Sequence, residues 1–141
     1  MFNKHKAMWE WLMQYPELYG YLKANTVDDV AGEVSFVTSY GDKWEHRHVR
    51  SHGIKRYDFA VAMIRQHDTG TSEINLEEIF DVEKFMSWVD EQNEDGNFPD
   101  FGEECRVISV ENLQNMPNLA GVDRDGAAAK YLFQCRVRYS V

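Results

Sequence analysis

The segment 131–141 alternates between two kinds of side chain up to its last residue, and this alternation limits the possible folds more than any other feature of the chain. One side of the alternation holds Tyr131, Phe133, Cys135, Val137, Tyr139 and Val141. The other side holds Gln134, Arg136, Arg138 and Ser140. A period of two is typical of a strand with one buried face. We therefore expect this segment to lie in a sheet with its apolar face covered.

The length of 141 residues suits one domain with one hydrophobic core, so we expect a single domain over residues 1–141. No apolar run has the length of a membrane span, and the first residues lead into an amphipathic segment, unlike a signal peptide. We therefore expect a cytosolic protein. Cys105 and Cys135 lie in strand-like runs without a Cys-x-x-Cys pair, which favours reduced packing residues over metal ligands or nucleophiles.

The formal net charge of −9 is concentrated in one block of the chain. Between Asp68 and Glu111 there are fourteen acidic residues and two basic ones, Lys84 and Arg106. A surface built to bind nucleic acid needs a dominant basic face. This balance argues against nucleic-acid binding as the main activity of the chain.

The first helix is expected over residues 3–15, ending before Pro16, because proline cannot donate the next backbone hydrogen bond. Its apolar residues at helical spacing are Ala7, Met8, Trp11, Leu12 and Tyr15. Trp9 and Trp11 cannot both point into the core from one helix. The favoured interpretation is that both lie at the periphery of the core; the alternative is that one lies against a neighbouring element or in solvent. A short helical turn with Leu18, Tyr19 and Leu22 and a connection over 27–32 are expected to follow.

The second helix is expected to begin at Asn75, which stands three residues before Glu78 in the manner of a capping box, and to end near Asn93. Its apolar stripe is predicted to comprise Ile79, Val82, Phe85, Met86 and Val89. Its outward residues are predicted to include Glu83, Lys84, Asp90 and Glu91.

Strands are expected over residues 33–40, 43–49, 55–66 and 105–110, in addition to the final segment. The strand 55–66 is apolar on both faces, which predicts a central position in the sheet. Short connections favour antiparallel neighbours. The sequence therefore predicts an α+β domain in the order α-β-β-β-α-β-β, with a mostly antiparallel sheet of about five strands and two helices on one face. The other face is expected to keep Tyr57, Arg136 and Arg138 for a partner.

The most suggestive polar cluster is the segment 46–52, which contains His46, His48 and His52. In a strand, His46 and His48 share a face, which is half of a metal site, but no further ligand stands at the spacing that zinc requires. Solvated residues of an edge strand are the favoured interpretation. Together with Lys43, Arg47, Arg50, Lys55 and Arg56, the same stretch forms a basic patch that suits an acidic partner, or it is simply a soluble hairpin.

Catalytic motifs are not evident in the sequence. There is no Gly-rich phosphate loop, His-Glu-x-x-His pair or Gly-x-Ser-x-Gly turn, and no serine stands with an identifiable base. The carboxylate pairs Glu77–Glu78 and Glu103–Glu104 are adjacent, so their side chains diverge and are expected to be solvated. We therefore expect a protein that is not an enzyme and that has no catalytic residue, metal or cofactor. A 13% content of aromatic residues and the segregated charge suit a protein that binds others of its kind.

Landmarks over nearly the whole chain resemble a known family, the minor capsid or tail-completion proteins of long-tailed bacteriophages that infect Gram-positive bacteria, which are similar to tail terminators. The likeness lies in Trp9-x-Trp11-Leu12 with Tyr15-Pro16, in Tyr57-Asp58-Phe59-Ala60 after a basic hairpin, in Phe85-x-x-Trp88-Val89, in Asn97-Phe98-Pro99 and in Tyr131-x-Phe133-x-x-x-Val137-x-Tyr139. These are landmarks of core and loops, without a catalytic signature.

The resemblance implies a small α+β subunit that forms a ring of its own copies, a hexamer being one arrangement, at the head–tail junction or the tail end. It also implies contacts with the tail tube protein and with head-closure or connector proteins, and a location in the host cytoplasm during assembly and then in the virion. The interface candidates are Lys43, Arg47, Arg50, Lys55, Arg56, Arg136 and Arg138. The alternatives are a head-closure protein, a small phage-encoded binding protein without a ring, and a metal-dependent enzyme that uses the histidine cluster.

Overall fold

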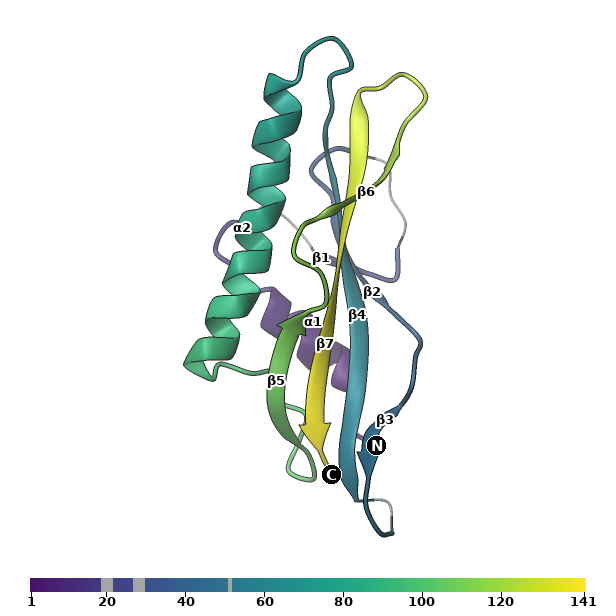
Figure 1. Ribbon diagram of the computed structural model, residues 1–141, viewed down its shortest axis with the longest axis vertical. Coiled ribbons are helices and arrows are strands. Elements are labelled where there is room, and N and C mark those ends of the chain that lie inside the picture. Colours follow the sequence, from purple (N-terminus) through teal and green to yellow (C-terminus); the bar gives the residue numbers. More distant parts are fainter. Residues whose placement is uncertain (19–21, 27–29, 51) are drawn as a thin grey trace.

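The computed structural model describes residues 1–18, 22–26, 30–50 and 52–141 and consists of two helices and a long, twisted sheet (Figure 1). The helices are α1 (Lys4–Leu12) and α2 (Glu73–Asp95). The strands are β1 (Leu22–Ala24), β2 (Val34–Thr38), β3 (Trp44–Arg47), β4 (Gly53–Gln66), β5 (Arg106–Asn112), β6 (Asn118–Val122) and β7 (Ala128–Ser140).

The sheet is built on a ribbon of two long antiparallel strands, β4 and β7, which pair from Ile54–Ser140 to Gln66–Ala128. β2 and β3 pair with successive parts of the free edge of β4, and β5 and β6 pair with successive parts of the free edge of β7. The three-residue strand β1 extends the sheet beyond β2 in parallel orientation. The predicted central position of the strand 55–66 is confirmed.

The prediction of an α+β protein with two helices is confirmed, but the sheet is mixed and has seven strands among the described residues, where about five in antiparallel pairing were expected. The predicted order therefore lacks two strands. β1 is too short for a periodic pattern, and β6 contains Gly121 and shows no alternation of apolar and polar residues. The other five strands lie within a few residues of their predicted positions.

One hydrophobic core joins both helices to one face of the ribbon. Alternate residues of β4 and β7 point into it, among them Phe59, Val61, Phe133, Cys135 and Val137. From the helices come Met8, Trp11, Leu12, Val82, Phe85 and Val89. Phe85 is at the centre of an aromatic cluster, because its ring lies 4.1 Å from that of Tyr15 and 5.5 Å from that of Phe133, centroid to centroid. Both helices thus cover the same face of the sheet.

Tyr57 was expected on the uncovered face and lies instead at the edge of the core. It shares the parity of Phe59 along β4, so its side chain is on the face that the helices cover. Its ring contacts that of Phe101, with 5.6 Å between centroids, and its hydroxyl lies 2.6 Å from Nδ1 of His5. Tyr57 therefore contributes to the fold and is unsuited to the partner contact predicted for it.

Helix α1 begins after Asn3, whose side chain accepts a hydrogen bond from the backbone N–H of Lys6, and it ends three residues before the predicted boundary. Turn-like backbone bonds continue to Tyr15, which still reaches the core. Trp11 is buried, whereas Trp9 packs at the edge of the core and donates from Nε1 to the carbonyl of Leu22. The favoured prediction of two peripheral tryptophans is therefore wrong for Trp11, and the alternative of one tryptophan against a neighbouring element describes Trp9.

The helical turn predicted around Leu18, Tyr19 and Leu22 is wrong at Leu22, which belongs to β1 and pairs with Val34. Parallel pairing with β2 satisfies the backbone of this residue better than an isolated turn does. Tyr19 and positions 27–29 of the predicted connection lie outside the described residues.

Helix α2 spans two residues more at each end than predicted and begins after Ser72. Asn75, the predicted cap, instead exchanges two hydrogen bonds with the backbone of Asp68 and thereby fixes the loop before the helix. Gly96, with a φ of 72°, ends the helix in the left-handed conformation that glycine favours. Neither helix, within the described part of the chain, has the length and apolar content needed to cross a membrane.

Candidate functional site

The hairpin formed by β3 and the start of β4 projects from one end of the molecule (Figure 1). Gly53 makes its geometry possible: its φ is 150°, and a Cβ atom there would lie 2.1 Å from the carbonyl oxygen of His46. The backbone of Gly53 also exchanges hydrogen bonds with Val141, so the base of the hairpin is joined to the end of β7. The described residues of the hairpin therefore form a projection on a fixed base.

Four of the seven predicted interface residues form the exposed part of this hairpin. Lys43, Arg47 and Arg50 are exposed, and Lys55 is half-buried. The cationic groups of Arg47 and Lys55 lie 5.2 Å and 4.7 Å from the centre of the Trp44 ring. We call Lys43, Arg47, Arg50 and Lys55 the basic hairpin cluster. Burial lowers the pKa of Lys55 from its ordinary value, and the nearby charges of Lys43 and Lys4 lower it further.

The other three predicted interface residues are engaged within the chain. Arg136 donates from Nε and Nη2 to the two carboxylate oxygens of Asp58, at 2.8 and 3.1 Å. Arg138 binds Glu45 in the same way, with 2.6 Å for both hydrogen bonds. Nε of Arg56 lies 3.8 Å from the same Glu45 carboxylate. We call these five residues the arginine ladder; it lies on the face of the sheet opposite the helices.

The arginine ladder gives its guanidinium groups a structural role. Hydrogen bonds from Arg138 lower the pKa of Glu45, and hydrogen bonding to Asp58 and Glu45 raises the pKa values of Arg136 and Arg138. A bidentate pair of this kind fixes both side chains and leaves fewer donors for a partner. The structure therefore separates the seven predicted residues into four at the hairpin and three that join β3, β4 and β7.

The three histidines of the cluster do not converge on one point. The rings of His46 and His48 are 4.5 Å apart between centroids in an edge-to-face arrangement, and Nδ1 of His52 lies 3.3 Å from the carbonyl oxygen of Val141. Within the described ranges, no group of three or more His, Cys, Asp or Glu side chains is placed to hold a metal ion. The histidine cluster thus adds polar surface to the hairpin.

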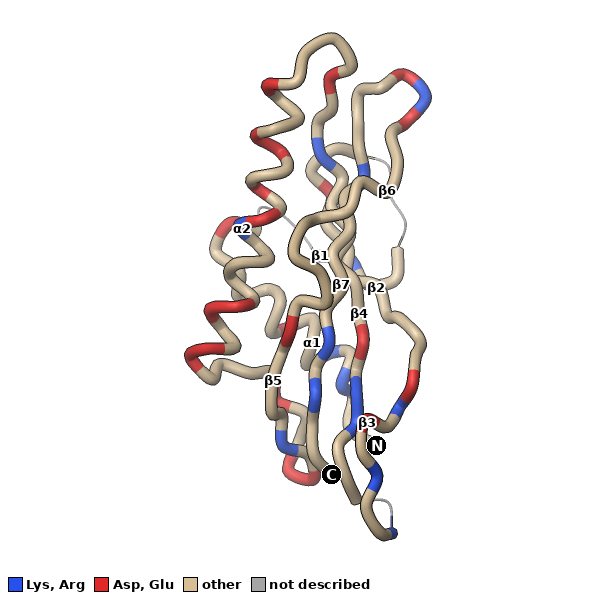
Figure 2. Tube along the Cα trace, viewed as in Figure 1, with Lys and Arg blue, Asp and Glu red and all other residues tan. Residues whose placement is uncertain are grey.

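The acidic block predicted from the sequence lies mainly along α2, as Figure 2 shows. Part of it is neutralised locally, since Arg65 contacts Glu78 and also donates to Asp81 at 3.0 Å. Glu78 therefore differs from the solvated side chain expected of the pair Glu77–Glu78, whereas Glu77, Glu103 and Glu104 are exposed as expected. The charge is separated in space as well as in sequence, with basic residues toward the hairpin and acidic ones along the helix.

Two large apolar side chains on α2 are exposed, and the sequence analysis did not predict their exposure. Leu76 and Phe80 remain 64% and 60% exposed, although both are large enough to be core residues. They stand four residues apart, outside the stripe of Val82, Phe85, Met86 and Val89. That second apolar pair at helical spacing is the signal that could have identified them.

A groove of about 420 Å³ adjoins Phe80, between α2 and the segment 15–17. It is lined by Tyr15, Pro16, Glu17, Phe80, Glu83, Lys84, Ser87, Trp88 and Glu91, and we call it the α2 groove. The ammonium group of Lys84 lies 5.2 Å from the centre of the Phe80 ring and 3.4 Å from Asp81. The α2 groove is therefore lined by aromatic and acidic side chains together with Lys84.

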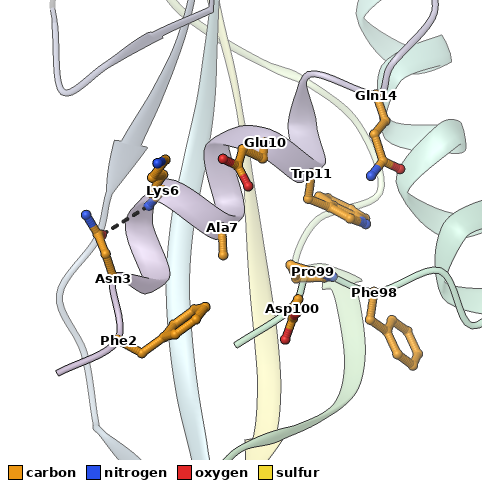
Figure 3. A pocket seen from close by; sticks show the side chains of 10 residues that line it. All are labelled: Phe2, Asn3, Lys6, Ala7, Glu10, Trp11, Gln14, Phe98, Pro99 and Asp100. Atoms are coloured by element: carbon orange, nitrogen blue, oxygen red, sulfur yellow. Dashed lines mark hydrogen bonds between the residues drawn. The ribbon is translucent and has the colours of Figure 1, made fainter. Parts of the chain in front are cut away.

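A second pocket of about 400 Å³ lies between α1 and the loop that follows α2 (Figure 3). Figure 3 shows Phe2, Ala7 and Trp11 on the side of α1 that faces Pro99 and Asp100. Trp11 donates from Nε1 to the carbonyl of Asn97 at 2.8 Å, and the Asn97 side chain donates to Gln14 and Gln92. These bonds fasten the loop to α1, and the polar groups around the pocket do not converge on a common point.

Comparisons with known proteins leave the family open. No protein-family model matches the chain, and no curated protein sequence matches it.

Proposed function

We propose that this chain is a structural subunit of a long-tailed bacteriophage that forms a ring of its own copies and completes or terminates the tail where it joins the head. The family resemblance suggests this role, and the observation that carries it is the separation of an exposed basic hairpin from an acidic helix. Opposite charges on two different surfaces suit a head-to-tail contact, which closes into a ring when the rotation per subunit divides a full turn.

In this proposal the basic hairpin cluster contacts an acidic surface of a neighbouring subunit or of the tail tube. The arginine ladder supports the same role indirectly, because it braces the base of the hairpin against β7 through Arg138 and Glu45. A braced projection loses little conformational freedom when it binds a partner. The subunit is made in the host cytoplasm and remains in the virion.

The test is a phage or prophage that encodes this chain with Arg47→Glu and Arg50→Glu. Both residues are exposed, so the fold should change in stability by about 0.5 kcal/mol or less. Filled heads together with unattached or overlong tails, seen by electron microscopy, are the expected result. A matched control with Lys6→Glu and Arg124→Glu makes the same change in net charge at exposed sites elsewhere and should assemble normally. Normal virions from the hairpin variant would contradict the proposal.

A further inference from the structure

The outermost side of α2 carries apolar residues where charged ones are expected. At 100° per residue, Leu76, Phe80, Glu83, Ser87 and Glu91 share the side opposite the buried residues Val82, Phe85 and Val89. A helix that has solvent alone on this side gains nothing from exposing a leucine and a phenylalanine one turn apart. This stripe continues into the α2 groove, so the apolar pair and the groove form one surface, on which the carboxylates of Glu17, Glu83 and Glu91 outnumber the ammonium group of Lys84.

The tip of the hairpin has the complementary composition. Val49 is 76% exposed and stands between the exposed residues Arg47 and Arg50. An apolar side chain flanked by two guanidinium groups matches a surface of aromatic and acidic side chains in both polarity and charge. Arginine also suits such a surface because its planar group binds carboxylates bidentately.

We propose that the α2 groove, with Leu76 and Phe80 beside it, receives the hairpin tip of a second copy of this chain. This inference rests on the proposed function and names the surfaces of the subunit contact. In it, Val49 packs on Phe80 and Leu76, while Arg47 and Arg50 pair with Glu83 and Glu91. The hairpin projects from one end of the molecule, whereas α2 runs along one side of it (Figures 1 and 2), so the two surfaces are separate and can bind different neighbours. The contact is therefore heterologous and can repeat from subunit to subunit.

Charge reversal on each surface separately tests this contact. One variant carries Arg47→Glu and Arg50→Glu, and the other carries Glu83→Lys and Glu91→Lys. Each variant alone presents like charges at every contact, so we expect its self-association, measured by sedimentation over a range of concentrations, to weaken at least about tenfold relative to the unaltered chain. A control with Glu103→Lys and Glu104→Lys makes the same change in net charge as the groove variant at exposed sites off α2 and should associate as the unaltered chain does.

Mixing the two variants distinguishes a specific contact from a general effect of charge. In the mixture, the acidic hairpin of one variant meets the basic groove of the other, and the basic hairpin meets the acidic groove. Association should therefore return in an equimolar mixture, and also in one chain that carries all four substitutions. A lack of recovery in both would overturn the proposal.

Crosslinking captures the contact directly, even where association is weak. Chains with Val49→Cys and chains with Phe80→Cys, both with Cys105→Ser, should form a disulfide with each other under mild oxidation more readily than either forms with itself. The proposal would be overturned if the unaltered chain stays monomeric and the Val49→Cys and Phe80→Cys chains form no disulfide with each other. If both charge-reversal variants associate as well as the unaltered chain, this contact is overturned but the ring-forming role in the phage is not. That role is tested separately by the phage assembly experiment.

Discussion

Arg138 of β7 binds Glu45 of β3 through two hydrogen bonds of 2.6 Å, although β4 lies between the two strands in the sheet. The pair therefore spans three strands and holds β3, which pairs with β4 at the edge of the sheet, against the ribbon. Both side chains are about a quarter exposed, so solvent screens the pair in part.

Glu45→Gln should lower the free energy of unfolding at pH 7 by about 1 kcal/mol, the upper range for a partly exposed ion pair. Because the pKa of Glu45 is lowered in the folded protein, the stabilisation is complete above the unfolded value of about 4.3 and disappears as the pH falls through the lower, folded value. Denaturant unfolding between pH 7 and pH 3 should show the two proteins converging in acid. A constant difference down to pH 3 would mean that the ionised carboxylate of Glu45 is not the source of the stabilisation; Glu104→Gln, at an exposed site, serves as the control.

Gly53→Ala should destabilise the protein by about 1–3 kcal/mol, the usual cost of a strained backbone position, because the new Cβ atom meets the carbonyl oxygen of His46. Gly121→Ala in β6 is the matched control, since nothing lies within 4 Å of its added Cβ atom. Thermal unfolding of both variants measures the difference. Equal stability of the two would show that the hairpin accommodates a side chain at position 53.

Phe85→Ala and Phe133→Ala should each lower the free energy of unfolding by about 3–5 kcal/mol, the range for truncating a buried aromatic side chain. Both residues are fully buried and their rings touch. Phe80→Ala removes an equally large ring that is 60% exposed and should cost less than about 1 kcal/mol. Urea titrations at one pH compare the three. A loss below about 1 kcal/mol at Phe85 would contradict its place in the core.

The thiol of Cys135 should react with iodoacetamide far more slowly than that of Cys105. Burial raises the pKa of the Cys135 thiol, so little of the reactive thiolate is present, whereas Cys105 is partly exposed. Mass spectrometry of the native protein should find one alkylated site, and the unfolded protein should show two. Rapid labelling of Cys135 in the native protein would mean that the sheet opens readily around β7.

The periodicity of the sequence was enough to predict the strands that bury a continuous face. The alternation in 131–141 predicts β7, and the two-sided apolar run in 55–66 predicts the central position of β4, because both patterns follow from burial. β1 and β6 escaped prediction since they are held by backbone pairing with a neighbour and not by an apolar pattern of their own. Backbone hydrogen bonds to the next strand leave no pattern of apolar and polar side chains in the sequence.

The candidate site shows the same limit. The exposed bases Arg47 and Arg50 were identified from charge alone, but charge did not reveal that Arg136 and Arg138 find carboxylates in Asp58 and Glu45, which lie far from them in sequence. Register across the sheet determines those partners, and register is a property of the whole fold. The exposed apolar pair on α2 went unrecognised because a leucine and a phenylalanine in a helix are normally assigned to the core.

The dominance of β7 in the sheet also determines how the chain folds. The paired residues of β4 and β7 with the smallest separation in sequence are Gln66 and Ala128, which are 62 residues apart. Closing this long loop therefore costs much conformational entropy before the hydrogen bonds between the strands form. Among the described strands, β5 and β6 pair with β7 alone, so their pairing forms once β7 has docked. Such long-range pairing is typical of chains that fold on the millisecond to second timescale. We therefore expect a single slow, cooperative step, in which the ribbon and both of its outer edges form together.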